Sequence, residues 1–163
     1  MSYDLILLHR AYLEDISSDA ALIARDRAEM ALAEIPGLRR LSALKYLYEK
    51  VNPELHLEVG LAEAGEEGGL KSMVFRFSYD HSLASCLLHV EEAYRLAFDL
   101  AERLHLGVFD PQVGGFVSPD DLERACQQAQ KKALQSQEYR AAHPPSHSQK
   151  RLWHRLKGLF GKR

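Results

Sequence analysis

The amino-acid sequence predicts an α+β domain with a ferredoxin-like fold, in which helices cover one face of a four-stranded antiparallel sheet. Two observations lead to this prediction. Apolar residues alternate with polar ones over residues 55–79, and they recur at helical spacing on both sides of this segment. The resulting order of elements is strand, helix (broken in two), strand, strand, helix and strand. This is the order of a split β-α-β unit, and one additional helix follows it.

The first third of the chain is expected to form one strand and two helical segments. Residues 3–9 are a compact apolar run with the length of a buried strand. Apolar residues at helical spacing predict a helix over 20–35 and a second one over 41–51. Proline-containing pairs at 36–37 and 52–53 end these two helices, because proline cannot continue a helix.

The clearest strand signal is an antiparallel hairpin in the middle of the chain. Apolar and polar residues alternate over 55–61 and again over 73–79, and a Gly-rich loop over 64–69 joins the two runs. The apolar residues of 83–104 lie on one face of a long helix, and the short apolar segment 107–109 predicts the final strand.

Two local signals follow the last predicted strand. The segment 110–115 predicts a turn, in which the Asp110 side chain accepts a hydrogen bond from the backbone that follows it. Ser118 and Pro119 then begin a mostly polar helix that has acidic residues in its first turn and extends to about Glu138. This additional helix is expected to lie on the surface.

The charged residues divide the chain into an acidic body and a basic tail. We expect a domain over residues 1–138, a flexible linker over 139–149 and a short amphipathic helix over 150–163. This last segment contains six of the 21 Lys and Arg residues and no acidic residue, which leaves 15 basic and 23 acidic side chains, a charge of −8, in residues 1–149. Such a body is not expected to bind nucleic acid, which requires a clustered positive surface.

The size and cysteine content predict a single cytoplasmic domain. A chain of 163 residues can bury one hydrophobic core but not comfortably two. Cys86 and Cys126 cannot form a disulfide framework, and the N-terminal segment lacks the charge and apolar run of a signal peptide. No apolar run approaches the roughly 20 residues that cross a bilayer.

The basic tail has the pattern of a cationic amphipathic helix. Five apolar residues would share one helical face: Leu152, Trp153, Leu156, Leu159 and Phe160. Basic side chains would occupy the other face, among them Arg151, Arg155 and Lys157. Three roles fit this pattern: attachment to an anionic membrane surface, docking into a groove of a partner protein, or packing back against the acidic body.

We expect no catalytic residue, metal or cofactor. His81, Cys86 and His89 are the nearest approach to a metal cluster, but a structural zinc site needs four ligands in paired short spacings. A buried cysteine and histidines at the solvent edge are expected instead. A thiol nucleophile at Cys86 would need a base and oxyanion donors that the sequence does not supply. Glu91 and Glu92 point about 100° apart on the predicted helix and are assigned to a solvated face.

Two stretches of the chain share a pattern with known proteins. They are the opening Tyr3-Asp4-Leu5 and the segment from Ala101-Glu-Arg-Leu104 through Val108-Phe109-Asp110-Pro111-Gln112 to Gly115 and Pro119. They resemble small bacterial α/β proteins that begin with a Tyr-Asp-Leu strand and carry a hydrophobic-Asp-Pro-Gln strand end. Some of these are similar to immunity proteins found beside secreted polymorphic or type VI toxins. The resemblance implies a ferredoxin-like domain and a toxin-neutralising role, and it carries over no catalytic residue.

The leading functional hypothesis is a cytoplasmic immunity (antitoxin) protein that neutralises a secreted bacterial toxin by direct binding. An acidic surface steers a protein onto a basic partner, and such a role needs no active site. One sheet face is expected to stay uncovered, as a surface for a partner or for a second copy in a homodimer. The expected contact residues are Glu58, Glu63, Glu66, Glu67, Asp80, Asp110 and Gln112.

Two alternatives remain at this stage. The first is an adaptor at the surface of the inner membrane, anchored by the basic tail. The second is a small enzyme of ferredoxin-like fold, in which His81, Cys86 and His89 would be the first residues to examine.

Overall fold

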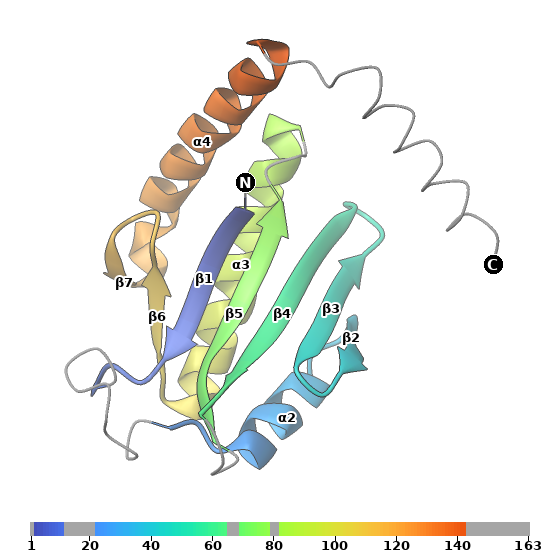
Figure 1. Cartoon of the computed structure of the whole chain (residues 1–163), viewed down its shortest axis with the longest axis vertical. Coiled ribbons are helices and arrows are strands. Elements are labelled where there is room, and N and C mark those ends of the chain that lie inside the picture. Colours follow the sequence, from blue (N-terminus) through green and yellow to red (C-terminus); the bar gives the residue numbers. More distant parts are fainter. Residues whose placement is uncertain (1, 12–21, 65–68, 79–81, 143–163) are drawn as a thin grey trace, which may run out of the picture.

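Seven strands form one antiparallel sheet in the order β2-β3-β4-β5-β1-β6-β7 (Figure 1). The computed structural model describes residues 2–11, 22–64, 69–78 and 82–142. The strands are β1 (Ser2–Leu8), β2 (Leu38–Ser42), β3 (Lys45–Lys50), β4 (Leu55–Glu63), β5 (Leu70–Ser78), β6 (Gly107–Asp110) and β7 (Gly115–Val117). The helices are α2 (Arg25–Ala33), α3 (Leu83–Leu104) and α4 (Leu122–Ala142), and a 3-10 turn, η3 (Pro119–Asp121), directly precedes α4.

The described helices lie on one face of the sheet. Helix α3 packs along this face against β4, β5, β1 and β6, and both α2 and α4 contact α3. Figure 1 looks onto the opposite face, with α3 running behind the central strands. None of the described helices covers that opposite face, which we call the open face.

The hydrophobic core lies between the sheet and α3. Strand side chains alternate between the two faces, so every second residue points toward the helices. Leu5 of β1 lies opposite Phe75 of β5 in the register, and both are buried together with Leu57 of β4. Val90 and Leu100 of α3 are fully buried and belong to the same cluster.

Several predicted elements are confirmed. Strands β4 and β5 form the predicted hairpin, and α3 has the predicted bounds. Strands β1 and β6 form where the first and last strands were expected. Ser118 begins the C-terminal helical segment as predicted: its backbone N–H and hydroxyl donate to Asp121 Oδ2 at 2.8 and 3.0 Å, and α4 continues to Ala142. The helix predicted over 20–35 is present only as the shorter α2, because Ile23, within its predicted first turn, forms an isolated β-bridge with Leu70.

The helix predicted over residues 41–51 is wrong, because β2 and β3 form a hairpin there. The apolar residues of this segment fit a helical period, but Tyr46 and Tyr48 also fit a period of two. Both tyrosines are buried, whereas Leu41 and Val51 of the supposed helical stripe are 50% and 93% exposed. Burial of two aromatic rings beside β4 outweighs the weak local preference for helix.

The prediction of a four-stranded ferredoxin-like sheet also requires correction. The four predicted strands lie together as β4, β5, β1 and β6, but β2 and β3 extend one edge and β7 the other. Val117 of β7 lies opposite Val108 of β6. The structure is thus α+β with a seven-stranded antiparallel sheet. The three-residue β7 escaped prediction because so short a segment shows no periodicity.

Candidate functional site

The open face carries an aligned row of charged side chains. Glu58 of β4 lies directly opposite Arg76 of β5, and Arg76 lies opposite Asp4 of β1. Leu47 of β3 continues the row on the other side of Glu58. Residues directly opposite on one face have their Cβ atoms about 5 Å apart, so these side chains are neighbours.

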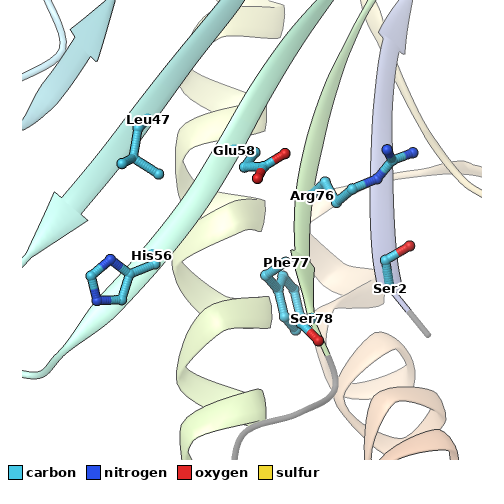
Figure 2. A pocket seen from close by; sticks show the side chains of 7 residues that line it. All are labelled: Ser2, Leu47, His56, Glu58, Arg76, Phe77 and Ser78. Atoms are coloured by element: carbon cyan, nitrogen blue, oxygen red, sulfur yellow. The ribbon is translucent and has the colours of Figure 1, made fainter. Parts of the chain in front are cut away.

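A groove of about 480 Å³ lies over this row, at the end of the sheet where β1 begins and β5 ends. Figure 2 shows Leu47, His56 and Glu58 on one side of it and Arg76 on the other. Ser2 and the residues at the end of β5 complete its lining. The groove therefore combines an apolar side chain, an imidazole and groups of both charges.

The two carboxylates of the row differ in their bonding. Asp4 accepts two hydrogen bonds from Arg76, 2.7 Å from Nε and 2.9 Å from the terminal nitrogen. These bonds, followed by the attraction of Asp4 and then Glu58, raise the pKa of Arg76. Glu58 faces Arg76 but makes no hydrogen bond or ion pair with any described residue, so its carboxylate is free to accept one from a ligand.

Further carboxylates surround His56 at the rim of the groove. Its Nδ1 lies 3.8 Å from Glu49 Oε1, and its Nε2 lies 3.3 Å from Glu54 Oε1. The only cation bonded to either glutamate in the described part of the chain is Arg39, 3.1 Å from Glu49. Together with Asp4 and Glu58, these glutamates make four carboxylates against the guanidinium groups of Arg39 and Arg76. Lys45, which lies opposite Gly60 on the same face, adds a third cation beside the row. Carboxylates still exceed these cations by one, so the groove is weakly electronegative.

A second, apolar row crosses the open face next to the charged one. Its members face one another across five strands: Gly60, Val74, Ile6, Phe109 and Phe116. The Phe109 and Phe116 rings meet edge to face at 5.7 Å, and the guanidinium of Arg10 lies 5.3 Å from the Phe116 ring centre. The larger side chains of the row are half-buried. A partner laid across this face would meet apolar and acidic groups side by side.

Asp110 belongs to the core and not to a surface. It is completely buried, and its Oδ2 accepts hydrogen bonds from the hydroxyls of Tyr3 at 2.5 Å and Tyr94 at 2.8 Å. Its Oδ1 accepts from the backbone N–H of Gln112 at 2.8 Å, as the predicted turn requires. Burial, followed by the hydrogen bond to Asp110, raises the pKa of both Tyr3 and Tyr94. This carboxylate cannot reach a partner on the surface.

Gln112 is half-buried and supports the same turn. With its amide nitrogen directed inward, the side chain donates to Asp110 Oδ1 and to the backbone oxygen of Asp4, both at 3.0 Å. Gln112 thus links the Asp-Pro-Gln segment to the Tyr-Asp-Leu strand. The two stretches that carry the sequence resemblance therefore meet in one buried hydrogen-bond network and have a structural role.

The other expected contact residues fall into two groups. Glu63 is exposed at the end of β4, where it accepts a hydrogen bond from Arg25 at 2.8 Å. Glu66, Glu67 and Asp80 lie outside the described residues. So do all the tail residues singled out above and residues 143–149 of the predicted linker, whereas residues 139–142 belong to α4 and not to a linker.

The residues considered for metal binding or catalysis are not arranged as a site. His81 lies outside the described residues. Cys86 is buried as predicted, but the prediction that His89 lies at the solvent edge is wrong, because His89 is completely buried. His89 Nε2 accepts from the backbone N–H of His56 at 3.1 Å, and its Nδ1 lies 2.6 Å from the Ser85 carbonyl oxygen. The Nε2 bond holds α3 to β4, and the Nδ1 contact lies within α3, so both ring nitrogens are engaged in structural contacts. No group of three metal-ligating side chains occurs within the described segments.

The prediction that Glu92 lies on a solvated face is wrong. It is 8% exposed and accepts hydrogen bonds from Arg95 and from the Tyr48 hydroxyl. Lys50 Nζ lies 3.8 Å from its Oε1. The bonds from Arg95, followed by that from Tyr48, outweigh desolvation and lower the pKa of Glu92 to about 2. This cluster fixes β3 to α3, and nothing in the sequence distinguishes Glu92 from the exposed Glu91.

Sequence reasoning missed Arg76, His56 and Leu47 as members of the groove. One signal was available: Glu58 and Arg76 lie equally far from residue 67 in the Gly-rich loop, so a hairpin centred there sets them opposite each other. Leu47 could not be placed, because its segment was assigned to a helix.

Comparison with known proteins does not assign this surface. The chain matches no model of a known protein family, and no curated protein matches its sequence. Among the described helices, none has the length and apolar character needed to cross a membrane.

Proposed function

We propose that this chain is a binding protein whose protein partner docks on the open face of the sheet. The observation that carries the proposal is the free carboxylate of Glu58 in an electronegative groove beside the apolar row. Interfaces combine an apolar centre with polar groups at its rim, and a charge without a bonding partner is available to pair with one across the interface. The face has both features.

We further propose that the partner is a basic bacterial toxin, and that the chain acts as its immunity protein in the cytoplasm. The charge of −8 over residues 1–149 supports a basic partner, because opposite charge accelerates encounter. The Tyr-Asp-Leu and Asp-Pro-Gln segments resemble those of bacterial proteins that are similar to immunity proteins. This resemblance supports a toxin as the partner. We also propose that β4, β5, β1 and β6 form a ferredoxin-like unit, which β2, β3 and β7 extend.

Affinity capture from the native bacterium tests the binding role. Full-length chain is used as bait, alongside Glu58→Arg and the matched control Glu102→Arg, which reverses an exposed charge on α3. We expect one stoichiometric partner with the unaltered chain and the control, and its loss with Glu58→Arg. A partner retained equally by all three baits would contradict binding at the groove.

The toxin assignment needs a separate test. The captured partner is expressed alone and together with this chain in a susceptible bacterium. Arrest of growth by the partner, relieved by the unaltered chain and not by Glu58→Arg, is the expected result. A partner that is harmless when expressed alone would contradict the immunity role but leave the binding role standing.

A further inference from the structure

We propose that the basic C-terminal tail, residues 150–163, docks on the open face of its own chain and covers the electronegative groove. The proposal concerns the molecule before any partner binds, and it does not depend on the identity of that partner. It assigns one occupant to the groove on three grounds: charge, apolar character, and the place where α4 ends.

The charges of the two surfaces are complementary. The tail contains six basic residues and no acidic one. The groove and its surroundings hold four carboxylates against Arg39, Arg76 and Lys45, and no described residue bonds to the Glu58 carboxylate. A basic side chain placed at Glu58 would therefore complete an ion pair without displacing the bond between Asp4 and Arg76.

The apolar residues of the tail also find a matching surface. At helical spacing, Leu152, Trp153, Leu156, Leu159 and Phe160 form one stripe, with basic residues beside it. On the open face, the apolar row runs parallel to the charged row and one step along the strands from it. A segment with adjacent apolar and basic stripes can contact both rows at once.

Helix α4, the last described element, ends near the part of the sheet where the groove lies. Helix α3 begins just after β5, and α4 runs back along α3 in the opposite direction (Figure 1). The last residue of α4, Ala142, therefore lies toward the end of the sheet where Ser2 and Ser78 line the groove. The seven residues 143–149, fully extended, can span about 25 Å. This reach exceeds the spacing of about 10 Å between packed layers, and we infer that the chain passes around the end of the sheet.

Trp153 makes the proposal testable in the full-length chain, because it is the only tryptophan in the sequence. Acrylamide quenching of its fluorescence at low salt is compared with that of a synthetic peptide of residues 150–163. We expect blue-shifted emission and several-fold weaker quenching in the chain than in the peptide. Equal quenching would overturn the proposal.

Charge reversal in the groove then identifies the docking surface. Glu58→Lys is expected to shift the docking equilibrium toward the free tail by about fivefold, the effect of losing one exposed ion pair, and added salt should act in the same direction. Glu102→Lys, an exposed reversal on α3, should leave the quenching unchanged. Quenching of Trp153 that is the same in Glu58→Lys as in the unaltered chain would show that the tail docks elsewhere and would overturn the proposal.

Two further results would show that the tail docks on a surface outside its own chain. Protection that increases with protein concentration would indicate docking on a second copy. A tail that is free in solution and becomes protected only on vesicles containing phosphatidylglycerol would indicate a membrane surface. Each overturns docking within the chain. Because no partner is present in these experiments, their outcome is independent of the capture experiment above.

Discussion

Tyr3 donates a hydrogen bond of 2.5 Å to Asp110, a residue 107 positions later in the chain. The bond joins the beginning of β1 to the end of β6, two adjacent strands of the sheet. Tyr94 of α3 donates to the same carboxylate oxygen, so one buried aspartate ties a helix and two strands together. Buried carboxylates are tolerated only when such donors satisfy them, and the removal of any member is costly.

We expect Asp110→Ala to lower the free energy of unfolding by about 3–5 kcal/mol, because it leaves several buried donors without an acceptor. Tyr3→Phe removes one donor and should cost about 1–2 kcal/mol. Urea unfolding of both variants and of the double variant gives the coupling between the residues. Additive losses would show that the two groups do not interact energetically.

The stability of the fold should decrease in alkaline solution. The pKa values of Tyr3 and Tyr94 are raised in the folded protein above the ordinary value of 10.0, first by burial and then by Asp110. Their contribution is fully present below the pKa of the unfolded chain and is lost as the pH rises above it. The free energy of unfolding, measured from pH 8 upward, should therefore fall beyond about pH 10. Tyr3→Phe should make this fall less steep, and an unchanged slope would contradict the network.

Glu92 should control part of the acid stability. Its pKa is lowered from 4.5 to about 2 by Arg95 and Tyr48, so it stabilises the fold above the unfolded value and loses this effect as the pH falls toward about 2. We expect Glu92→Gln to cost about 2 kcal/mol at neutral pH and little at pH 2. Glu91→Gln is the matched control, because Glu91 is exposed on the same helix. Equal pH profiles for the two variants would refute this role.

Gly37, in the turn between α2 and β2, should not tolerate a side chain. Its φ is +83°, and an added Cβ would lie 3.0 Å from the Glu49 carbonyl oxygen. Gly37→Ala should therefore destabilise the protein by about 1–2 kcal/mol, as measured by thermal or urea unfolding. Gly60→Ala is a suitable control, since its Cβ would meet nothing within 4 Å. A neutral or stabilising effect at Gly37 would contradict the close approach of this turn to β3.

Once a partner is identified, its association rate should depend on Glu58. Glu58→Gln is expected to slow association by a few-fold at low salt and to weaken the salt dependence, because long-range attraction acts mainly on the rate of encounter. Stopped-flow measurements at two ionic strengths would test this. The double variant Glu66→Gln/Glu67→Gln tests whether these two residues contribute to the association rate. Rates unchanged by Glu58→Gln would exclude the groove from the encounter.

The pattern of apolar residues by itself determined the β4–β5 hairpin and α3, because long or strictly alternating segments admit one interpretation. It also located β1 and β6, as short continuous apolar runs. It also determined the Ser118 helix start and the Asp110 turn, since both depend on contacts within a few residues. Tertiary structure decided the rest. Residues 41–51 fit both periods, and only the burial of Tyr46 and Tyr48 beside β4 selects strands. The burial of Asp110 and Glu92 depends on helix–sheet contacts. The alignment of Glu58, Arg76 and Asp4 depends on pairing between strands. Local sequence encodes neither kind of contact.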